Sequence, residues 1–259
     1  MSFFRSVTRS IHLAGHFVRF GAELLIRRPS TREARAEWLH RFASIALERL
    51  GIEIEVSGGF PTQGAVISNH LSYLDIIVFA ALRPCVFVSK VEVADYPVLG
   101  WMTTMAGTVY VARGYGGSAL KARADLEAVL HAGLPVVFFP EGTTTNGDGM
   151  LKFHSGLLAQ VRATGGSVTA AHLCYRLGEG NGDATVGDDV CYWGDHVVLM
   201  PHIFRLLGLR GIRAEVRFAA EPIAFSSELE NRKRTAQEAW VAVAELGQVQ
   251  TSTETVHYF

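Results

Sequence analysis

Cysteine is scarce in this chain, and no cysteine stands at a spacing that would bind a metal or build a disulfide framework. The three thiols, Cys85, Cys174 and Cys191, are odd in number, widely spaced and set in apolar surroundings. No second histidine or carboxylate is spaced to join His70 as a metal ligand. The sequence therefore predicts buried thiols in a reducing compartment, with no disulfide and no bound metal.

The sequence also lacks the glycine signatures of two large groups of proteins. A serine hydrolase would carry its nucleophile in Gly-x-Ser-x-Gly, and the only comparable stretch, at 154–156, lacks the flanking geometry. A nucleotide-binding loop would read Gly-x-Gly-x-x-Gly or would match a P-loop, and the glycine-rich stretch at 113–118 matches neither. These absences argue against both classes, and we expect no cofactor.

No apolar run is long enough to cross a bilayer, which takes roughly 20 mostly apolar residues. Residues 3–26 are apolar but are interrupted by arginines, and no small-residue cleavage site follows them, so neither a transmembrane helix nor a signal peptide is predicted. The pattern is typical of a helix in the membrane interface, or of an amphipathic helix packed on the domain. The apolar residues that fall roughly along one side of this helix are Val7, Ile11, Phe17 or Val18, Leu24 and Leu25.

The chain as a whole has no excess of either charge, with 24 Lys and Arg against 25 Asp and Glu. Its first 50 residues nevertheless contain nine arginines and four glutamates. A cationic end is attracted to an anionic surface, either nucleic acid or the cytoplasmic leaflet of a membrane. No Ser/Pro-rich linker or charge block divides the rest. We therefore assign residues 1–50 to basic, membrane-associating amphipathic helices and residues 51–259 to one domain.

After Gly51, short apolar strands alternate with helices. This order predicts an α/β fold with a mainly parallel sheet covered by helices on both faces, preceded by the amphipathic helical segment. A helix from a cap at Ser30 or Thr31 to about Leu50 precedes the first strand. Strands are expected at 52–56, 65–68, 85–89, 108–112, 136–139, 168–175 and 214–218, and helices at 72–82, with Ser72 as cap, and at 118–132, 202–207 and 228–246.

Polar residues follow three of the predicted strands. His70, Arg113 and Glu141 each lie just past a strand end. Because active sites of parallel sheets gather at the carboxyl ends of the strands, these three positions predict a shared pocket.

His70 and Asp75 have the chemistry of a general base and its orienting carboxylate. Imidazole has a pKa near neutrality and can take a proton from a hydroxyl nucleophile. A carboxylate on its other ring nitrogen fixes the tautomer and stabilises the imidazolium. The spacing alone is commonplace, so the neighbouring segments decide its meaning.

Two further segments end predicted strands on polar groups. The turn from Phe139 to Thr145 exposes backbone N–H groups and the Glu141 carboxylate, which would suit an acceptor's hydroxyls or a developing oxyanion. The segment from Gly107 ends on Arg113, whose guanidinium suits phosphate. Taken singly, each has an ordinary alternative, a solvated turn or a surface ion pair.

Taken in order, these segments resemble the glycerolipid acyltransferase family, of which bacterial 1-acylglycerol-3-phosphate acyltransferase is the best-known member. Its block Asn-His-x-Ser-x-x-Asp is similar to residues 69–75, and its block Gly-x-hydrophobic-aromatic-hydrophobic-x-Arg to residues 107–113. A third block, Phe-Pro-Glu-Gly-Thr, matches residues 139–143. The resemblance covers roughly residues 38–225, with the blocks in the family's order and spacing.

The resemblance implies transfer of a fatty acyl group from acyl-carrier protein or coenzyme A to a lysolipid hydroxyl, with no cofactor. His70 would deprotonate that hydroxyl and Asp75 would orient His70. The positions implied to bind substrate are Glu141, Gly142, Thr143, Arg113 and Lys90. The partners would be the thioester donor, the lysolipid and a membrane surface, without nucleic acid. The enzyme would lie at the cytoplasmic face of the cell membrane, peripheral or monotopic.

Two departures bear on the acceptor. Phosphatidate-forming members usually carry Arg after Phe-Pro-Glu-Gly-Thr, where this chain has Thr144, and the fourth block at 168–172 lacks its proline. The segment 192–202 resembles one found in relatives that act on varied lysolipids, including lyso-ornithine lipid. The expected acceptor is 1-acylglycerol-3-phosphate, giving phosphatidic acid. The alternatives are another lysolipid such as lyso-ornithine lipid, or an inactive membrane lipid-binding protein.

Overall fold

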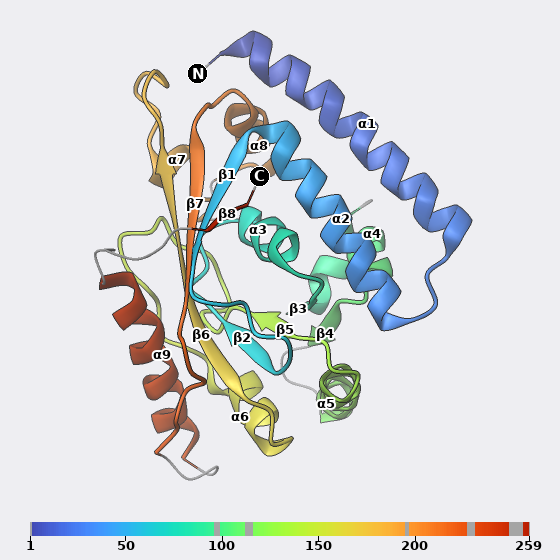
Figure 1. Cartoon of the computed structure of the whole chain (residues 1–259), viewed down its shortest axis with the longest axis vertical. Helices are drawn as coiled ribbons and strands as arrows, with labels where there is room; N and C mark the ends of the chain where they lie inside the picture. Colours follow the sequence, from blue (N-terminus) through green and yellow to red (C-terminus); the bar gives the residue numbers. More distant parts are fainter. Residues whose placement is uncertain are drawn as a thin grey trace.

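One mixed β-sheet forms the centre of the molecule in the computed structural model of the chain (Figure 1). The structure describes residues 2–95, 99–111, 116–194, 197–226, 231–248 and 256–258, with 99, 116–123 and 256–258 as backbone only. The strands are β1 (Ile52–Ser57), β2 (Ala65–Ile67), β3 (Val86–Lys90), β4 (Val109–Val111), β5 (Val136–Phe138), β6 (Val168–Leu177), β7 (Ile212–Phe218) and β8 (Val256–Tyr258).

The strands are arranged in the order β4-β3-β5-β2-β6-β7-β1-β8. The first five run parallel to one another. β7 is antiparallel to β6 and parallel to β1, and β8 closes the far edge antiparallel to β1. The carboxyl ends of β2, β3, β4 and β5 therefore lie at one edge of the sheet, as the sequence predicts for a site built there.

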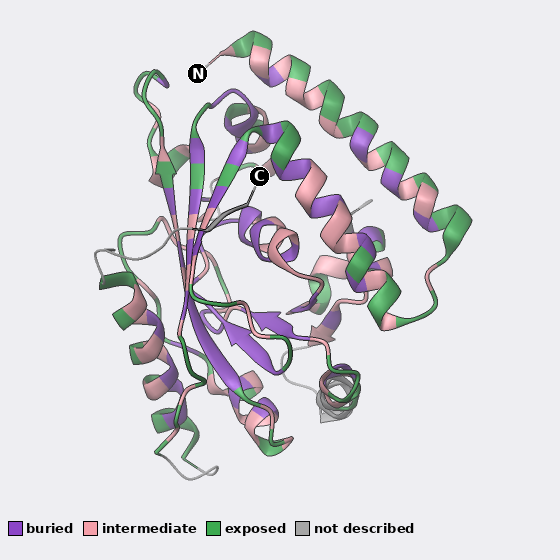
Figure 2. Ribbon diagram, in the orientation of Figure 1, coloured by how far each residue is buried: buried purple, intermediate pink, exposed green. Residues whose placement is uncertain are grey.

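Helices cover both faces of the parallel strands, which confirms the predicted fold class. Along β5, Val137 faces the core that includes α2 (Arg32–Leu50), α3 (Leu74–Leu82) and α8 (Leu199–Leu207). Its neighbours Val136 and Phe138 face the opposite core, with α5 (Gly116–His131), α6 (Ser155–Ala163) and α9 (Arg232–Gln248). Because successive side chains alternate and both faces are buried, these strands read as continuous apolar runs. The two central strands β2 and β5 are purple throughout in Figure 2.

The β7–β1 end of the sheet is apolar on one face only. Ile52, Ile54 and Val56 lie in the core beside α2, whereas the alternate positions Glu53 and Glu55 point to the other face. There Arg213 of β7 pairs with Glu55 at 2.9 Å. This alternation is the pattern expected of a strand with one solvated face.

The amino-terminal helix α1 (Phe3–Arg27) lies outermost, along α2 and against α8 (Figure 1). Phe20 and Leu24 are fully buried against Trp38 and Phe42 of α2 and Met102 of α4 (Leu99–Met105). The prediction that this helix has a single apolar side is therefore wrong, because its apolar residues lie on two faces, one buried and one exposed. The large apolar side chains of α1 that remain exposed are Phe3, Phe4, Ile11, Val18, Leu25 and Ile26.

The exposed apolar residues of α1 form a regular stripe. Phe4, Ile11, Val18 and Leu25 recur every seven residues, which is close to two full turns of an α-helix. We call these four residues the outer stripe. Within the described residues, no helix is both long enough and apolar enough to span a membrane.

Several local predictions need adjustment. Ser72 does not cap α3, since the helix starts at Leu74 and its N-cap residue is Tyr73. Thr31 does cap α2, by accepting from the Ala34 N–H at 3.2 Å. The short helix α7 (Val186–Asp189) and the 3-10 turn η1 (Val91–Asp95) were not predicted, and neither were α4, α6 and β8. Residues 228–230 of the last predicted helix, and Ala112 of the fourth predicted strand, lie outside the described residues.

Candidate active site

Asn69 fixes the point at which the chain leaves β2. Its side-chain Nδ2 donates to the Leu173 carbonyl of β6 at 2.8 Å, and its Oδ1 accepts from the Leu173 N–H at 2.8 Å. The residue is buried, and Ser68 Oγ also donates to its Oδ1. The following residue, His70, is therefore held at a fixed position beyond the sheet edge.

His70 and Asp75 meet as the sequence predicts. Nδ1 of His70 lies 2.7 Å from Oδ2 of Asp75, which is fully buried in the first turn of α3. The same Oδ2 accepts from the backbone N–H groups of Leu71 at 2.6 Å and Ser72 at 3.0 Å. Since the carboxylate is ringed by donors, the ring nitrogen facing it carries hydrogen, and Nε2 becomes the acceptor nitrogen of a neutral imidazole.

Tyr175 completes the shell of Asp75, and nothing in the local sequence singled it out. Its hydroxyl donates to Oδ1 of Asp75 at 2.8 Å from the middle of β6, across 100 residues of sequence. Burial and the adjacent carboxylate raise the pKa of Tyr175 well above its ordinary value, so the phenol stays a donor. Both oxygens of Asp75 are thus hydrogen-bonded, as a buried carboxylate requires.

The face of the His70 ring is held by Phe139, the first residue after β5. The two rings stack with centroids 4.0 Å apart and an interplanar angle of 6°. The His70 side chain keeps 17% of its surface exposed, and Nε2 has no hydrogen-bond partner among the described residues. The ring is therefore fixed on one edge and one face, while its basic nitrogen remains open to a substrate.

Glu141 is turned towards the protein. Its Oε1 accepts from the His70 N–H at 2.8 Å and its Oε2 from the Leu151 N–H at 2.7 Å. Only 2% of the residue is exposed, and burial raises the pKa of this carboxyl although the two backbone donors oppose the shift. These contacts position His70 and the 141–151 loop. Binding of the acceptor by Glu141 stays a prediction.

The other predicted site residues are distributed around this centre. Gly142 turns the chain in the left-handed region at φ 69°, donating to Phe139 O at 3.1 Å, and Thr143 beside it is exposed. Lys90 ends β3 at the same sheet edge. Arg113 lies outside the described residues. The roles of these four residues therefore remain predictions.

Tyr192 and His202, near the two ends of the segment 191–202, contact the loop between His70 and Asp75 from outside. His202 of α8 directs Nε2 to the Cys191 carbonyl at 2.8 Å, so its Nδ1 accepts from the Tyr73 hydroxyl at 3.1 Å. The Tyr192 N–H donates to Leu71 O at 2.9 Å. This segment therefore supports the turn between His70 and Asp75. Among the described residues, including this site, no three His, Cys, Asp or Glu residues are grouped to hold a metal ion.

Comparison with known proteins shows which family the chain belongs to. A sequence profile for the family described as Acyltransferase matches residues 52–173, which include the dyad and the Phe139–Gly142 turn. A lyso-ornithine lipid O-acyltransferase of Pseudomonas aeruginosa is 37% identical over 211 residues, which cover 80% of this chain and 75% of the relative. The chain belongs to the glycerolipid acyltransferase family.

This glycerolipid acyltransferase has relatives with two different acceptors in their names. A 1-acyl-sn-glycerol-3-phosphate acyltransferase of Neisseria meningitidis serogroup B is 29% identical over 246 residues, covering 89% of each chain. The crystal structure of the 1-acyl-sn-glycerophosphate acyltransferase PlsC of Thermotoga maritima has the same fold. It superposes with a TM-score of 0.66 at 20% identity and covers 96% of this chain and 97% of that one. The chain is thus an acyltransferase that acts on lysolipids.

Proposed function

We propose that His70 is the general base of an acyl transfer from a thioester to a lysolipid hydroxyl. The contact that carries this proposal is the 2.7 Å bond from Nδ1 to Asp75, which leaves Nε2 open at the sheet edge. Nε2 takes the proton of the hydroxyl as its oxygen attacks the thioester carbonyl. The carbon–oxygen bond forms, the carbon–sulfur bond breaks, and the proton passes from the imidazolium to the departing thiolate.

Asp75 holds the imidazole in the reactive tautomer and stabilises its positive charge during this step. No covalent acyl-enzyme is needed, because the base acts directly on the acceptor. The donor in this proposal is acyl-carrier protein or coenzyme A, each of which presents the same thioester carbonyl to the site.

For the acceptor we propose lyso-ornithine lipid. The relative from Pseudomonas aeruginosa with that name is 37% identical, against 29% for the 1-acyl-sn-glycerol-3-phosphate acyltransferase from Neisseria meningitidis. Thr144 supports the same choice, because a neutral side chain stands where phosphatidate-forming members usually place Arg. The second candidate is 1-acylglycerol-3-phosphate, supported by Lys90 at the sheet edge and by the 89% coverage of the Neisseria relative.

We further propose that the enzyme works at the cytoplasmic face of the cell membrane, with α1 in the lipid interface. The outer stripe supports this location because four large apolar side chains face outwards, between 63% and 84% exposed. The positions between them on the same face, Thr8, Gly15 and Ala22, are exposed and uncharged. A helix with this pattern lies in the membrane surface with its apolar side in the acyl boundary.

The test is thiol release by the purified protein with a panel of lysolipids and both donors, each donor tried with each acceptor. We expect turnover with lyso-ornithine lipid to exceed turnover with 1-acylglycerol-3-phosphate. The reverse order would assign the protein to phosphatidate formation. Absence of turnover with every pair would favour a lipid-binding protein without catalysis.

His70→Ala should lower kcat about 10³-fold, the size of effect of a general base. Asp75→Asn should have a comparable effect because the amide favours the wrong imidazole tautomer. His131→Ala is the matched control, since that histidine is exposed on α5 and, among the described residues, bonds only within its own helix, at Glu127 O. Normal turnover by the His70 variant would overturn the mechanism.

A further inference from the structure

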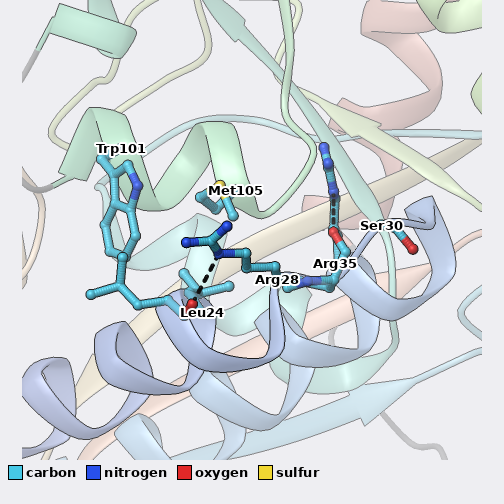
Figure 3. A pocket seen from close by; sticks show the side chains of 8 residues that line it. Leu24, Arg28, Ser30, Arg35, Trp101 and Met105 are labelled. Carbon is cyan, nitrogen blue, oxygen red and sulfur yellow. Dashed lines mark hydrogen bonds between the residues drawn. The ribbon is translucent and has the colours of Figure 1, made fainter.

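A cavity of about 470 Å³ opens between the end of α1, the turn into α2, and α4. Figure 3 shows Arg28 extending across it, with Trp101 on one side and Arg35 on the other. None of the residues that line it belongs to the His70 site. The lining residues are Leu24, Leu25, Arg28, Pro29, Ser30, Arg35, Trp101 and Met105.

The two arginines of this cavity have no carboxylate partner among the described residues. Nε of Arg28 donates to the Leu25 carbonyl at 3.2 Å, and Nε of Arg35 donates to the Pro29 carbonyl at 3.0 Å. Each bond engages one nitrogen and leaves the terminal nitrogens of the guanidinium unpaired within the described structure. Two uncompensated guanidinium groups on one cavity attract an anion with several acceptor oxygens.

The arginines that neighbour Arg28 and Arg35 in the sequence do have carboxylate partners. Arg27 and Arg41 both pair with Glu23, and Arg32 pairs with Asp125. Between residues 27 and 41, the other three arginines thus each contact a carboxylate, whereas Arg28 and Arg35 contact none in the described part of the chain. Two arginines without such a contact therefore line the same cavity.

The backbone holds both arginines in place. Arg28 is the helix C-cap of α1 and lies in the left-handed region at φ 42°, the one described non-glycine residue with a positive φ. A residue other than glycine is uncommon there, and such positions cluster at functional sites. The stem of Arg35 lies beside Gly107, where an added Cβ would be 3.6 Å from the Arg35 Cδ.

Apart from Ser30, the rest of the cavity wall is apolar, and it continues into the outer stripe. Leu25, a member of that stripe, lines the cavity and is 63% exposed, and Trp101 is 38% exposed. The Trp101 ring packs over α1, 3.7 Å from where a Cβ on Gly21 would stand. An occupant therefore meets positive charge at one part of the cavity and hydrocarbon at another, which is the chemistry of an amphiphile.

We propose that this cavity binds the head group of an anionic phospholipid of the surrounding membrane. The phosphate bonds to Arg28 and Arg35, and the first part of an acyl chain lies against Leu25, Trp101 and Met105. The lipid is not the substrate, and it fixes the depth and orientation of the α1–α2 hairpin. This inference rests on the proposed membrane location and is independent of the transfer reaction at His70.

Glutamine is the informative replacement, because its Nε2 stands at the same point of the side chain as the arginine Nε. The double variant R28Q/R35Q keeps a donor for each backbone carbonyl and removes both charges. The matched control R19Q/R27Q removes two charges from the same end of the protein without touching the cavity. Arg27 is 73% exposed in its side chain, and Arg19 lies over the Phe20 ring.

The fluorescence of Trp101 can show which lipid lies beside it. The full chain is bound to vesicles of phosphatidylcholine with a minor fraction of phosphatidylglycerol. Brominated chains are placed either on the phosphatidylglycerol or on an equal fraction of the phosphatidylcholine. Bromine quenches indole fluorescence on contact, and subtraction of the Trp101→Phe signal removes the other three tryptophans.

For the native chain and for R19Q/R27Q we expect about tenfold enrichment of phosphatidylglycerol over phosphatidylcholine at Trp101, since guanidinium–phosphate contacts are charge-assisted. For R28Q/R35Q we expect equal quenching from both vesicle types. Equal quenching in the native chain, or enrichment that survives R28Q/R35Q, would overturn the proposal.

Two further experiments are needed. The first distinguishes a lipid phosphate from free phosphate, and the second distinguishes the cavity proposal from the proposed acyl transfer at His70. Inorganic phosphate at the same bulk concentration as the lipid should leave the enrichment unchanged; if it abolishes the enrichment, the cavity binds free phosphate and the lipid proposal fails. His70→Ala should show native enrichment without turnover, so loss of catalysis is distinguished from loss of the site. A chain that binds no vesicles contradicts the cavity proposal directly.

Discussion

At Asp75 a single buried carboxylate accepts four hydrogen bonds, and the one from Tyr175 comes from a distant strand. Tyr175→Phe leaves Oδ1 of Asp75 buried without that donor, which costs about 1–3 kcal/mol for such a group. We expect kcat to fall about tenfold or more while KM for both substrates stays near its native value. Steady-state kinetics with the donor and acceptor varied separately would measure this split.

The control for this substitution is Tyr110→Phe, because the Tyr110 hydroxyl bonds Thr103 and Thr104 of α4, away from Asp75. A merely structural role for Tyr175 would lower thermal stability and leave kcat per folded molecule unchanged. That outcome would remove Tyr175 from the positioning of the dyad.

The site residues that could be predicted from the sequence are those that lie close together in short sequence motifs. His70 and Asp75 lie within one turn, and their block in company with the Phe139 turn indicated a base and its orienter. Tyr175 could not be found in this way, since its role depends on β6 lying beside β2. The orientation of Glu141 could not be predicted from the sequence either. A carboxylate at a strand end can bind a ligand or accept hydrogen bonds from the backbone, and only the fold distinguishes the two.

The two faces of α1 lead to two different predictions for the same helix. Ile11, Val18 and Leu25 are exposed, so serine at all three should leave the fold intact and weaken vesicle binding. At about 1 kcal/mol for each partly inserted side chain, the loss is about 100-fold in partitioning. Sedimentation with anionic vesicles measures it, with Val241→Ser on α9 as an exposed apolar control. Undiminished binding by the triple variant would show that the outer stripe does not meet the membrane.

The inner face of α1 belongs to the folded core. Phe20 is fully buried among Trp38, Phe42 and Met102, so Phe20→Ala should lower the free energy of unfolding by about 3–5 kcal/mol. Val18→Ala, at 72% exposure on the same helix, should change it by less than about 0.5 kcal/mol. Denaturant unfolding compares the two. Equal effects would mean that α1 is not docked in solution, and they would contradict the packing of Phe20 against α2 and α4.

At the scale of elements, the central strands were predictable because each is a short apolar run bounded by turn residues. The helices α4 and α6 were not predicted, since they are only seven and nine residues long and give a periodic pattern little room. The two apolar faces of α1 were not predicted for a different reason. Apolar residues recur on both of its faces, and the sequence alone does not say which face meets protein.

Acid should destabilise the whole molecule through its buried histidines. Burial and the nearby Arg217 lower the pKa of His172 from 6.5 to about 4, and burial also lowers the pKa values of His16 and His202. Between pH 6.5 and 4 the unfolded chain binds more protons at His172 than the folded chain, so the free energy of unfolding falls as pH falls. The shift corresponds to about 3 kcal/mol at roughly 1.4 kcal/mol per pKa unit.

His172→Leu isolates this effect, because leucine does not titrate and Glu141, with its raised pKa, contributes with the opposite sign in both proteins. Unfolding curves of the two proteins at several pH values should diverge as the pH passes from 4 to 6.5, with the native chain showing the steeper dependence. His131→Ala, on the surface, should keep the native slope. Parallel curves for the His172 variant and the native chain would rule out this source of acid lability.

The side chain of Asn69 has a consequence for the path of the main chain. An amide carries one N–H side and one C=O side, so this side chain presents Leu173 with the same pair of groups as a peptide unit. The sheet's hydrogen bonding thus extends beyond the point where the backbone itself has turned away. The peptide groups of His70 are released, and its N–H bonds Glu141 while its C=O bonds the Thr145 N–H. Because the Asn69 side chain takes the place of a peptide unit in the sheet, the backbone of His70 is available to join its own loop to the turn that contains Glu141 and Thr145.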